Sequence, residues 1–336
     1  MIRTAEFVSL GHPDKTADFI TSYILDKLIV QDPTIKYGVE VMVKDNTVVL
    51  GGEICGNIDK NNLSVWVKEA LRAIGYDERY ASLWKDNAIN INKIDVIDLI
   101  GVQSPEINQG VMQNGWGDQG VFVGYACQGS NYLPKELYLA RKLANTFYEK
   151  ARRSDNLGLD IKAQITLNED NRIKTAILAI PMRTPVVISH QEIADILGEM
   201  PEQIIINGTG SYTYHSAVAD CGITGRKLAC DFYSTACPIG GGSPWTKDAT
   251  KADLTLNLYA RQLAIKYLKD NDECFVYLSS CIGRSDLPSA VIKTIKNNII
   301  MTQNIDVIKS PKEIIADLGL DKPVFANMCQ QGIVLF

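Results

Sequence analysis

The chain has 336 residues, which at roughly 150 residues per domain allows two or three domains. Its hydrophobic content of 46% and charged content of 22% are typical of a folded globular protein and exclude a disordered chain. With 34 basic and 39 acidic residues the net charge is -5, so no chain-wide positive field exists, and we expect neither a nucleic-acid nor a membrane partner. No targeting segment and no run of about 18 apolar residues is visible, and we expect a cytoplasmic protein.

The first half of the chain shows a repeated hairpin and helix. Pro13 opens a helical pattern of apolar residues that reaches Leu28. Residues 37–43 and 47–54 predict a β-hairpin, which residues 61–74 follow as an amphipathic helix. A second hairpin is predicted for residues 161–167 and 173–180, and Ser189 with Glu192 marks the start of the next helix.

The last third is predicted to contain a related unit, with strands at residues 227–233 and 274–282 separated by a helix over residues 248–267. Linkers are placed at residues 110–117 and 207–210, where Gly and Asn gather. Mixed runs of strands and helices favour an α+β fold.

Residues 11–15, with the sequence Gly-His-Pro-Asp-Lys, place polar side chains at the predicted start of a helix. Such a helix end favours phosphate, Asp14 suits a divalent cation, and His12 suits a donor to a developing oxyanion. The alternative is a capped helix with solvated charges. Residues 117–120 (Gly-Asp-Gln-Gly) alone indicate no more than a tight turn.

A second set of motifs combines glycines with cations. Residues 220–227 end in Arg226 and Lys227, and a triple glycine at 240–242 precedes Lys247 and Lys251, which we expect on one helix face. These features favour a polyphosphate site over a solvated charge run, although the spacing does not match a Walker A loop. Asp14 and Asp253 then become candidate magnesium ligands, because magnesium takes one or two carboxylates plus phosphate oxygens.

Six motifs, in order along nearly the whole chain, resemble the methionine adenosyltransferase (S-adenosylmethionine synthetase) family. They lie at residues 11–15, 51–54 (Gly-Gly-Glu-Ile), 103–110 (Gln-Ser-Pro-Glu-Ile-Asn-Gln-Gly), 117–120, 220–227 and 240–253. The resemblance implies three similar α+β domains of mixed sheet plus helices with a pseudo-threefold arrangement, which we place at residues 1–110, 111–219 and 220–336. It also implies a homodimer in which each active site draws residues from both subunits, and such dimers often pair into tetramers.

The implied reaction is attack by the sulfur of L-methionine on C5′ of ATP, with release of triphosphate that is then hydrolysed to pyrophosphate and phosphate. The family uses two Mg²⁺ and one K⁺ per site; Asp14 and Asp253 resemble the magnesium ligands and Glu40 the potassium ligand. The residues with catalytic roles by resemblance are His12, Lys162, Asp118 and Arg226. Those expected to contact ATP or its triphosphate are His12, Lys15, Asp160, Lys162, Ser211, Tyr212, Asp220, Arg226, Lys227, Ser243 and Lys247. Those expected near methionine are Glu53, Gln103, Asp118, Asp220 and Lys251.

The chain departs from the family in three places. Residues 111–116 form a shorter connection than the loop that relatives carry over the active site, which predicts weaker closure. Tyr212 replaces the Phe expected to stack on adenine, and Ser243 begins a bulkier stretch after the triple glycine. The alternatives to an active enzyme of this family are a relative with altered nucleotide or methionine-analogue preference, and a non-catalytic regulatory subunit of the same fold.

Overall fold

The structure is a computed structural model that describes residues 2–56, 59–102 and 115–335. The described residues form three sheets, each covered on one face by helices, and this confirms the predicted α+β fold. No helix among them is long and apolar enough to cross a membrane.

The first sheet is built around the first predicted hairpin. Its strands are, in spatial order, β4 (Asp95–Val102), β3 (Thr47–Cys55), β2 (Lys36–Lys44) and β9 (Gly222–Ile223). Strands β2 and β3 are antiparallel and turn at Asp45 and Asn46, as predicted. Its helices are α1 (Pro13–Gln31), α2 (Leu63–Ile74) and α3 (Glu78–Trp84). Alternate residues of β2, including Val39, Val41 and Val43, are buried on the face that α1 covers.

The central sheet pairs the N-terminal strand with the second predicted hairpin. Its strands are β1 (Arg3–Val8), β6 (Lys162–Leu167), β7 (Ile173–Ala179) and β8 (Gln203–Ile206). Its helices are α5 (Lys135–Ala151) and α6 (His190–Leu197). The Ser189 side chain accepts a hydrogen bond from the Glu192 amide, so α6 begins where the sequence predicted.

The third sheet is antiparallel, with strands β12 (Ile299–Asn304), β11 (Ser289–Lys296), β10 (Glu273–Ser280) and β5 (Gly120–Cys127). It packs on α9 (Ala252–Leu268), which is buried almost all round. The short helices that follow are α10 (Pro311–Asp317) and α11 (Phe325–Gln331). The short helices α7 (Ser216–Ala219) and α8 (Leu228–Asp231) lie before α9.

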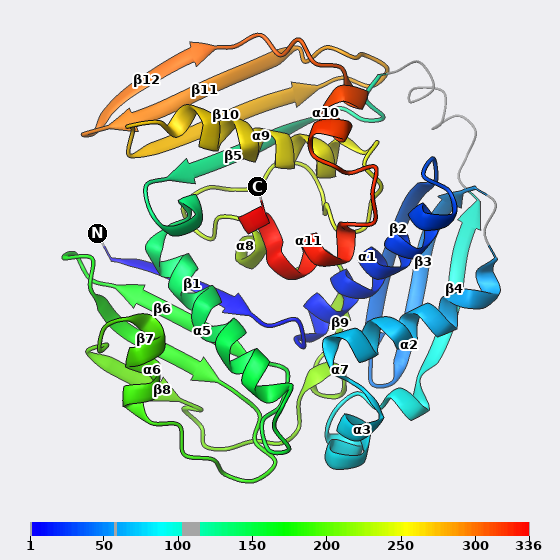
Figure 1. The fold of residues 1–336 in the computed structure, drawn as a ribbon, viewed down its shortest axis with the longest axis vertical. Coiled ribbons are helices and arrows are strands. Elements are labelled where there is room, and N and C mark those ends of the chain that lie inside the picture. The colour runs from blue at the N-terminus through cyan, green and yellow to red at the C-terminus, as the bar shows by residue number, and fades with distance from the viewer. Residues whose placement is uncertain (1, 57–58, 103–114, 336) are drawn as a thin grey trace.

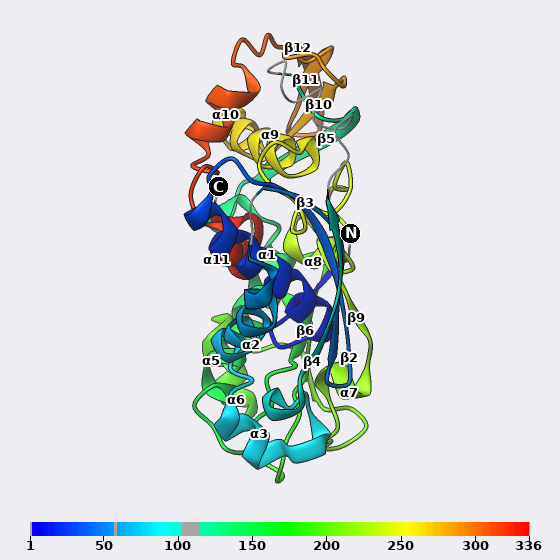
Figure 2. The ribbon, with the colours of Figure 1, turned by 90° about the vertical axis from the view of Figure 1, so that its right-hand side faces the viewer.

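The three sheet units lie around a centre where α1, α8 and α11 come together (Figure 1). Edge-on, β2, β3 and β9 lie on one side of a flattened molecule, whereas α1, α2, α5 and α11 lie on the other (Figure 2). The uncovered faces of the sheets therefore point to one side.

Two local predictions were wrong. Residues 227–233 were predicted to be a strand, but they contain α8, because Asp231 is held inward by buried partners. The helix predicted from residue 248 begins only at Ala252, since Asp248 instead accepts hydrogen bonds from the amide and hydroxyl of Thr250. Lys247 and Lys251 therefore do not share a helix face.

Candidate active site

His12 is the N-cap of α1 and is almost completely buried. Its Nδ1 accepts a hydrogen bond from the Asp14 amide at 3.1 Å, so the ring proton belongs on Nε2. Burial, reinforced by the nearby cations Lys162 and Lys227, lowers the pKa of His12 to about 3. The ring is therefore neutral at physiological pH and presents Nε2 as a donor.

Asp14, in the first turn of α1, links this helix to residues 222–227. One carboxylate oxygen accepts from the Ile223 amide at 2.9 Å, and the other is 2.6 Å from Nζ of Lys227. Gly222 permits the close approach, because a Cβ there would lie 2.2 Å from the Pro13 carbonyl oxygen. The helix start and the Arg226–Lys227 motif are thus fixed together, with the Arg226 guanidinium 3.8 Å from Asp14.

Asp160 lies just before β6. Its Oδ2 accepts from the Ser216 amide at 3.0 Å, while Oδ1 is buried without a hydrogen-bond partner. Burial raises the pKa of Asp160 to about 6, against the lowering effect of the Ser216 amide. An unpartnered buried carboxylate oxygen fits a ligand that brings a hydroxyl or another donor.

Lys162 and Asp220 complete the surroundings of His12. Both lie close enough to affect its ionisation, Lys162 lowering and Asp220 raising its pKa. We call this set the histidine group: His12, Asp14, Asp160, Lys162, Asp220, Arg226 and Lys227. It combines a neutral donor with three cations at a helix N-terminus, which suits a polyanion with a basic leaving oxygen.

A second set lies at the triple glycine. Lys247 pairs with one oxygen of Asp253, and the other oxygen accepts from the Gly242 amide at 2.9 Å. Gly241 has φ +69°, and a Cβ there would lie 2.3 Å from Asp253. The Ser243 hydroxyl is buried without a partner, and Lys251 is the half-buried N-cap of α9. We call Ser243, Lys247, Lys251 and Asp253 the glycine-loop group.

Glu40 and Glu53 lie on the uncovered face of the first sheet, in adjacent rows of paired residues. Glu40 accepts hydrogen bonds from the hydroxyls of Thr246, at 3.0 Å, and Thr224. Thr246 immediately precedes Lys247, and Thr224 follows β9, so Glu40 lies between the two groups.

The remaining expected residues are dispersed. Asp118 is exposed just before β5 and accepts from the Gln119 amide at 2.7 Å. Ser211 is exposed, and Tyr212 is partly buried, which raises the pKa of its hydroxyl. Gln103 and most of the short 111–116 connection lie outside the described residues.

Lys15 does not join the histidine group through its side chain. Its ammonium points into the protein, 2.6 Å from Asp231 and 3.2 Å from Asp18. Sequence reasoning gave no role to these two carboxylates or to Thr224 and Thr246. Polar residues inside apolar runs, such as Asp18 and Asp231, were the available signal.

Hydrogen bonds and ion pairs of the described residues connect members within the histidine group and within the glycine-loop group, but none connects one group directly to the other.

Comparisons with known proteins define the class of the molecule. Models of S-adenosylmethionine synthetase match nearly the whole chain in order, with the N-terminal domain at residues 1–105, the central domain at 113–214 and the C-terminal domain at 215–335. A solved structure described as an unusual S-adenosylmethionine synthetase from Campylobacter jejuni aligns with a TM-score of 0.83 at 29% identity, over 99% of this chain and 94% of that one.

Curated relatives agree. The chain is 33% identical to the S-adenosylmethionine synthase of Paramagnetospirillum magneticum and 30% identical to that of Pelagibacter ubique, in each case over 98% of this chain and 91% of the relative. The chain belongs to the S-adenosylmethionine synthetase family.

Proposed function

We propose that the chain is an active methionine adenosyltransferase that forms S-adenosylmethionine from ATP and L-methionine. The observation that carries this proposal is the buried, neutral His12, which presents an Nε2 proton near Lys162 and Lys227, while Arg226 lies 3.8 Å from the neighbouring Asp14. Family membership supplies the reaction.

In this reaction the methionine sulfur forms a bond to C5′ of ATP while the C5′–O5′ bond breaks, and the electron pair leaves with the triphosphate. His12 donates to O5′ as that oxygen gains charge, an interaction worth about 3–4 kcal/mol when well placed. Arg226, Lys227, Lys162 and Lys247 neutralise the leaving triphosphate, and Asp118 faces the developing sulfonium. Because the sulfur attacks directly, the protein needs no covalent nucleophile. Water then cleaves the triphosphate in the same site.

Asp14 and Asp253 are the residues that would hold two Mg²⁺ ions. Both residues offer carboxylate oxygens, the donors that Mg²⁺ prefers, and each carboxylate is paired with a lysine ammonium, Lys227 and Lys247 respectively. Magnesium usually takes one or two protein carboxylates together with phosphate oxygens, so each aspartate would bind its ion jointly with the triphosphate. Magnesium when bound would offset the charge of the triphosphate. Glu40, with its two threonine hydroxyls, is proposed for K⁺.

We also propose a homodimer, because the uncovered face of the first sheet is apolar next to the expected site residues. One row of paired residues there is Ile223, Met42, Val49 and Ile97, and the next row places Leu99, 64% exposed, in line with Glu40. Apolar side chains exposed in rows favour burial against another protein surface. A second copy on this face would bring Glu40 and Glu53 to its own site residues.

The test is to incubate the purified protein with ATP, methionine, Mg²⁺ and K⁺ and to measure S-adenosylmethionine, pyrophosphate and phosphate together. Equal amounts of all three are expected. ADP instead would indicate phosphoryl transfer, and no product from a folded dimer would favour a regulatory subunit. Repeating the assay with GTP tests the substituted Tyr212, and equal rates would contradict a retained adenine preference.

A further inference from the structure

Lys15 lies in a buried polar cluster at the centre of the molecule. Only 2% of the residue is exposed, and Nζ lies 2.6 Å from Asp231, 3.2 Å from Asp18 and 3.6 Å from Sγ of Cys329. These acceptors use the three hydrogens of the ammonium. Burial opposes the charge, yet Asp231 and Asp18 raise the pKa of Lys15 above its usual range.

Each acidic residue of the cluster also contacts a segment of the active site, Asp18 through its carboxylate and Asp231 through its backbone amide. Asp18 accepts from the Gly225 amide at 2.8 Å, immediately before Arg226. Asp231 belongs to α8, which starts directly after Lys227, and the Asp231 amide donates to the Lys227 carbonyl oxygen at 3.0 Å. The ammonium of Lys15 thus ties α1 to both ends of the Arg226–Lys227 segment.

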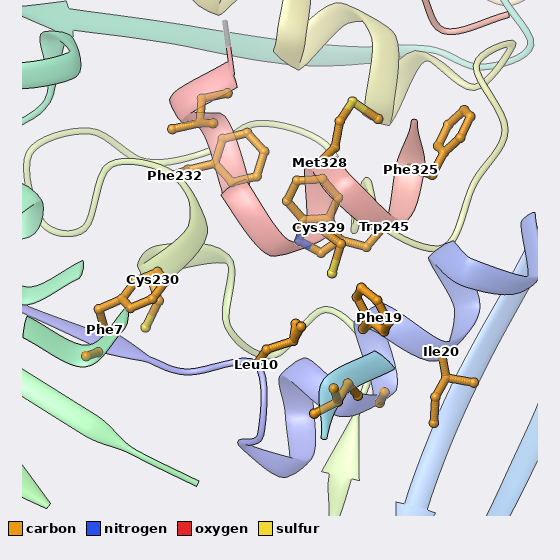
Figure 3. Packing of buried hydrophobic residues seen from close by; sticks show 14 of the residues in the cluster. Phe7, Leu10, Phe19, Ile20, Cys230, Phe232, Trp245, Phe325, Met328 and Cys329 are labelled. Carbon is orange, nitrogen blue, oxygen red and sulfur yellow. The ribbon is translucent and has the colours of Figure 1, made fainter. Parts of the chain in front are cut away.

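The cluster extends to the glycine-loop group through Trp245. The indole nitrogen of Trp245 donates to Asp231 at 2.8 Å, and Nζ of Lys15 lies 5.2 Å from the centre of the indole ring. Two residues later in the chain is Lys247. Phe232, Met328 and Cys329 lie around the indole (Figure 3), and all three are buried.

We propose that Lys15 is a positioning residue, which holds the Arg226–Lys227 segment and the start of α1 in the geometry for catalysis, and does not bind the triphosphate. This inference rests on the proposed function. A phosphate oxygen at Nζ would have to displace a charge-assisted hydrogen bond inside the protein, whereas the loss of Lys15 would let both tethered segments shift. Displacements of about 1 Å cost roughly 10²-fold in rate.

A double-mutant cycle of Lys15→Met, Asp231→Asn and the double variant tests this. We expect Lys15→Met to lower kcat about 100-fold while KM for ATP changes less than about threefold, since the triphosphate keeps all its cations. Asp231→Asn should lower kcat about tenfold. The double variant has the same net charge in the cluster as the wild type, and its kcat should be no lower than that of Lys15→Met. Tripolyphosphate with Mg²⁺, titrated calorimetrically, should bind every variant as it binds the wild type.

Two results would overturn the proposal. In the first, the affinity for tripolyphosphate falls tenfold or more in Lys15→Met but not in Asp231→Asn, and the losses of kcat in the two single variants multiply in the double variant. This result would make Lys15 a ligand of the triphosphate. Alternatively, Lys15→Met and Asp231→Asn could both keep the kcat of the wild type per folded dimer and differ only in a lower melting temperature. Lys15 would then have a purely structural role. If Lys15→Met does not fold, the same measurements of kcat and tripolyphosphate affinity are compared between Asp231→Asn and the double variant, which differ only at Lys15.

Lys27→Met is the matched control, because Lys27 lies on the same helix and pairs with Glu69 at 2.8 Å on the surface. It should keep wild-type kinetics. A wild-type protein that forms no S-adenosylmethionine would contradict the proposed function, whereas an active wild type with an equally active Lys15→Met contradicts only this inference.

Discussion

His12 can donate to a leaving oxygen only while its Nδ1 is occupied as an acceptor, and the backbone of α1 provides the donor for it. The sequence placed His12 at this helix end but could not show which ring nitrogen faces the ligand. The sequence also could not show where the Lys15 side chain points. Its direction depends on buried partners more than 200 residues away in the chain, such as Asp231.

At the residue scale we expect His12→Ala to lower kcat about 10² to 10³-fold with little change in KM for ATP, because the lost hydrogen bond strengthens only as O5′ gains charge. Initial rates over a range of ATP concentrations measure both constants. His190→Ala, which removes an exposed histidine, should behave as the wild type. A variant changed only in KM would remove His12 from the transition state.

Asp160 gives a pH prediction. With its pKa near 6, the carboxylate is ionised at pH 7 and becomes protonated as the pH falls through 6, so its oxygens accept hydrogen bonds less well at low pH. We expect KM for ATP to rise below pH 6 in the wild type, relative to Asp160→Asn, which cannot titrate. The measurement is the ratio of the two KM values between pH 5 and 8. A ratio that does not vary with pH would show that Asp160 does not contact the nucleotide.

At the element scale, local pattern located both hairpins and the helices that follow them, since these elements depend on turns, caps and apolar periodicity within a few residues. It failed at α8 and at the start of α9. In both places a carboxylate, Asp231 or Asp248, has distant partners such as Lys15 and the Tyr37 amide. Long-range pairing of this kind overrides local propensity, and the neighbouring sequence does not identify the distant partner.

The docking of α11 yields an element-scale prediction through Asp26 on α1. Its carboxylate accepts from the amides of Phe325 and Ala326, both at 2.9 Å, at the start of α11. Burial nevertheless raises the pKa of Asp26 from 3.8 to about 6, against the effect of these amides. The folded protein then keeps a proton that the unfolded chain has released between these pH values. This group therefore lowers the free energy of unfolding as the pH rises from about 4 to 6.

Melting temperatures of the wild type and Asp26→Asn, measured from pH 4 to 7.5, test this. Because all other groups titrate alike in both proteins, the difference isolates Asp26. The wild type should lose stability relative to the variant up to about pH 6 and then remain level. A difference that stays constant across the range would show that Asp26 is not destabilised by burial.

At the scale of the whole molecule, each sheet takes a strand from a distant part of the chain. Strand β1 pairs with β6, β5 with β10, and β9 with β2. Hydrophobic pattern shows that a segment is a strand but does not identify its partner, so these pairings were not predictable from the residues alone. They determine the site, since β1 lies beside Lys162 and β9 beside Asp14. The domain boundaries at residues 110 and 219 stay a prediction.

If each active site joins the histidine group of one subunit to the glycine-loop group of its partner, two inactive variants should restore each other. His12→Ala and Asp253→Asn alter different groups. In a mixed dimer one site carries both changes and the other carries neither. Random pairing makes half of the dimers mixed, so co-expression should recover about a quarter of the wild-type activity.

The matched control is co-expression of His12→Ala with Lys227→Met, which both lie in the histidine group. Every site of that mixed dimer keeps one defect, and no recovery is expected. Tags of different kinds on the two chains allow the mixed dimer to be purified, and its specific activity should be about half that of the wild type. A purified mixed dimer of His12→Ala and Asp253→Asn without activity would show that both groups act within one subunit. The apolar sheet face would then not be needed to form the active site.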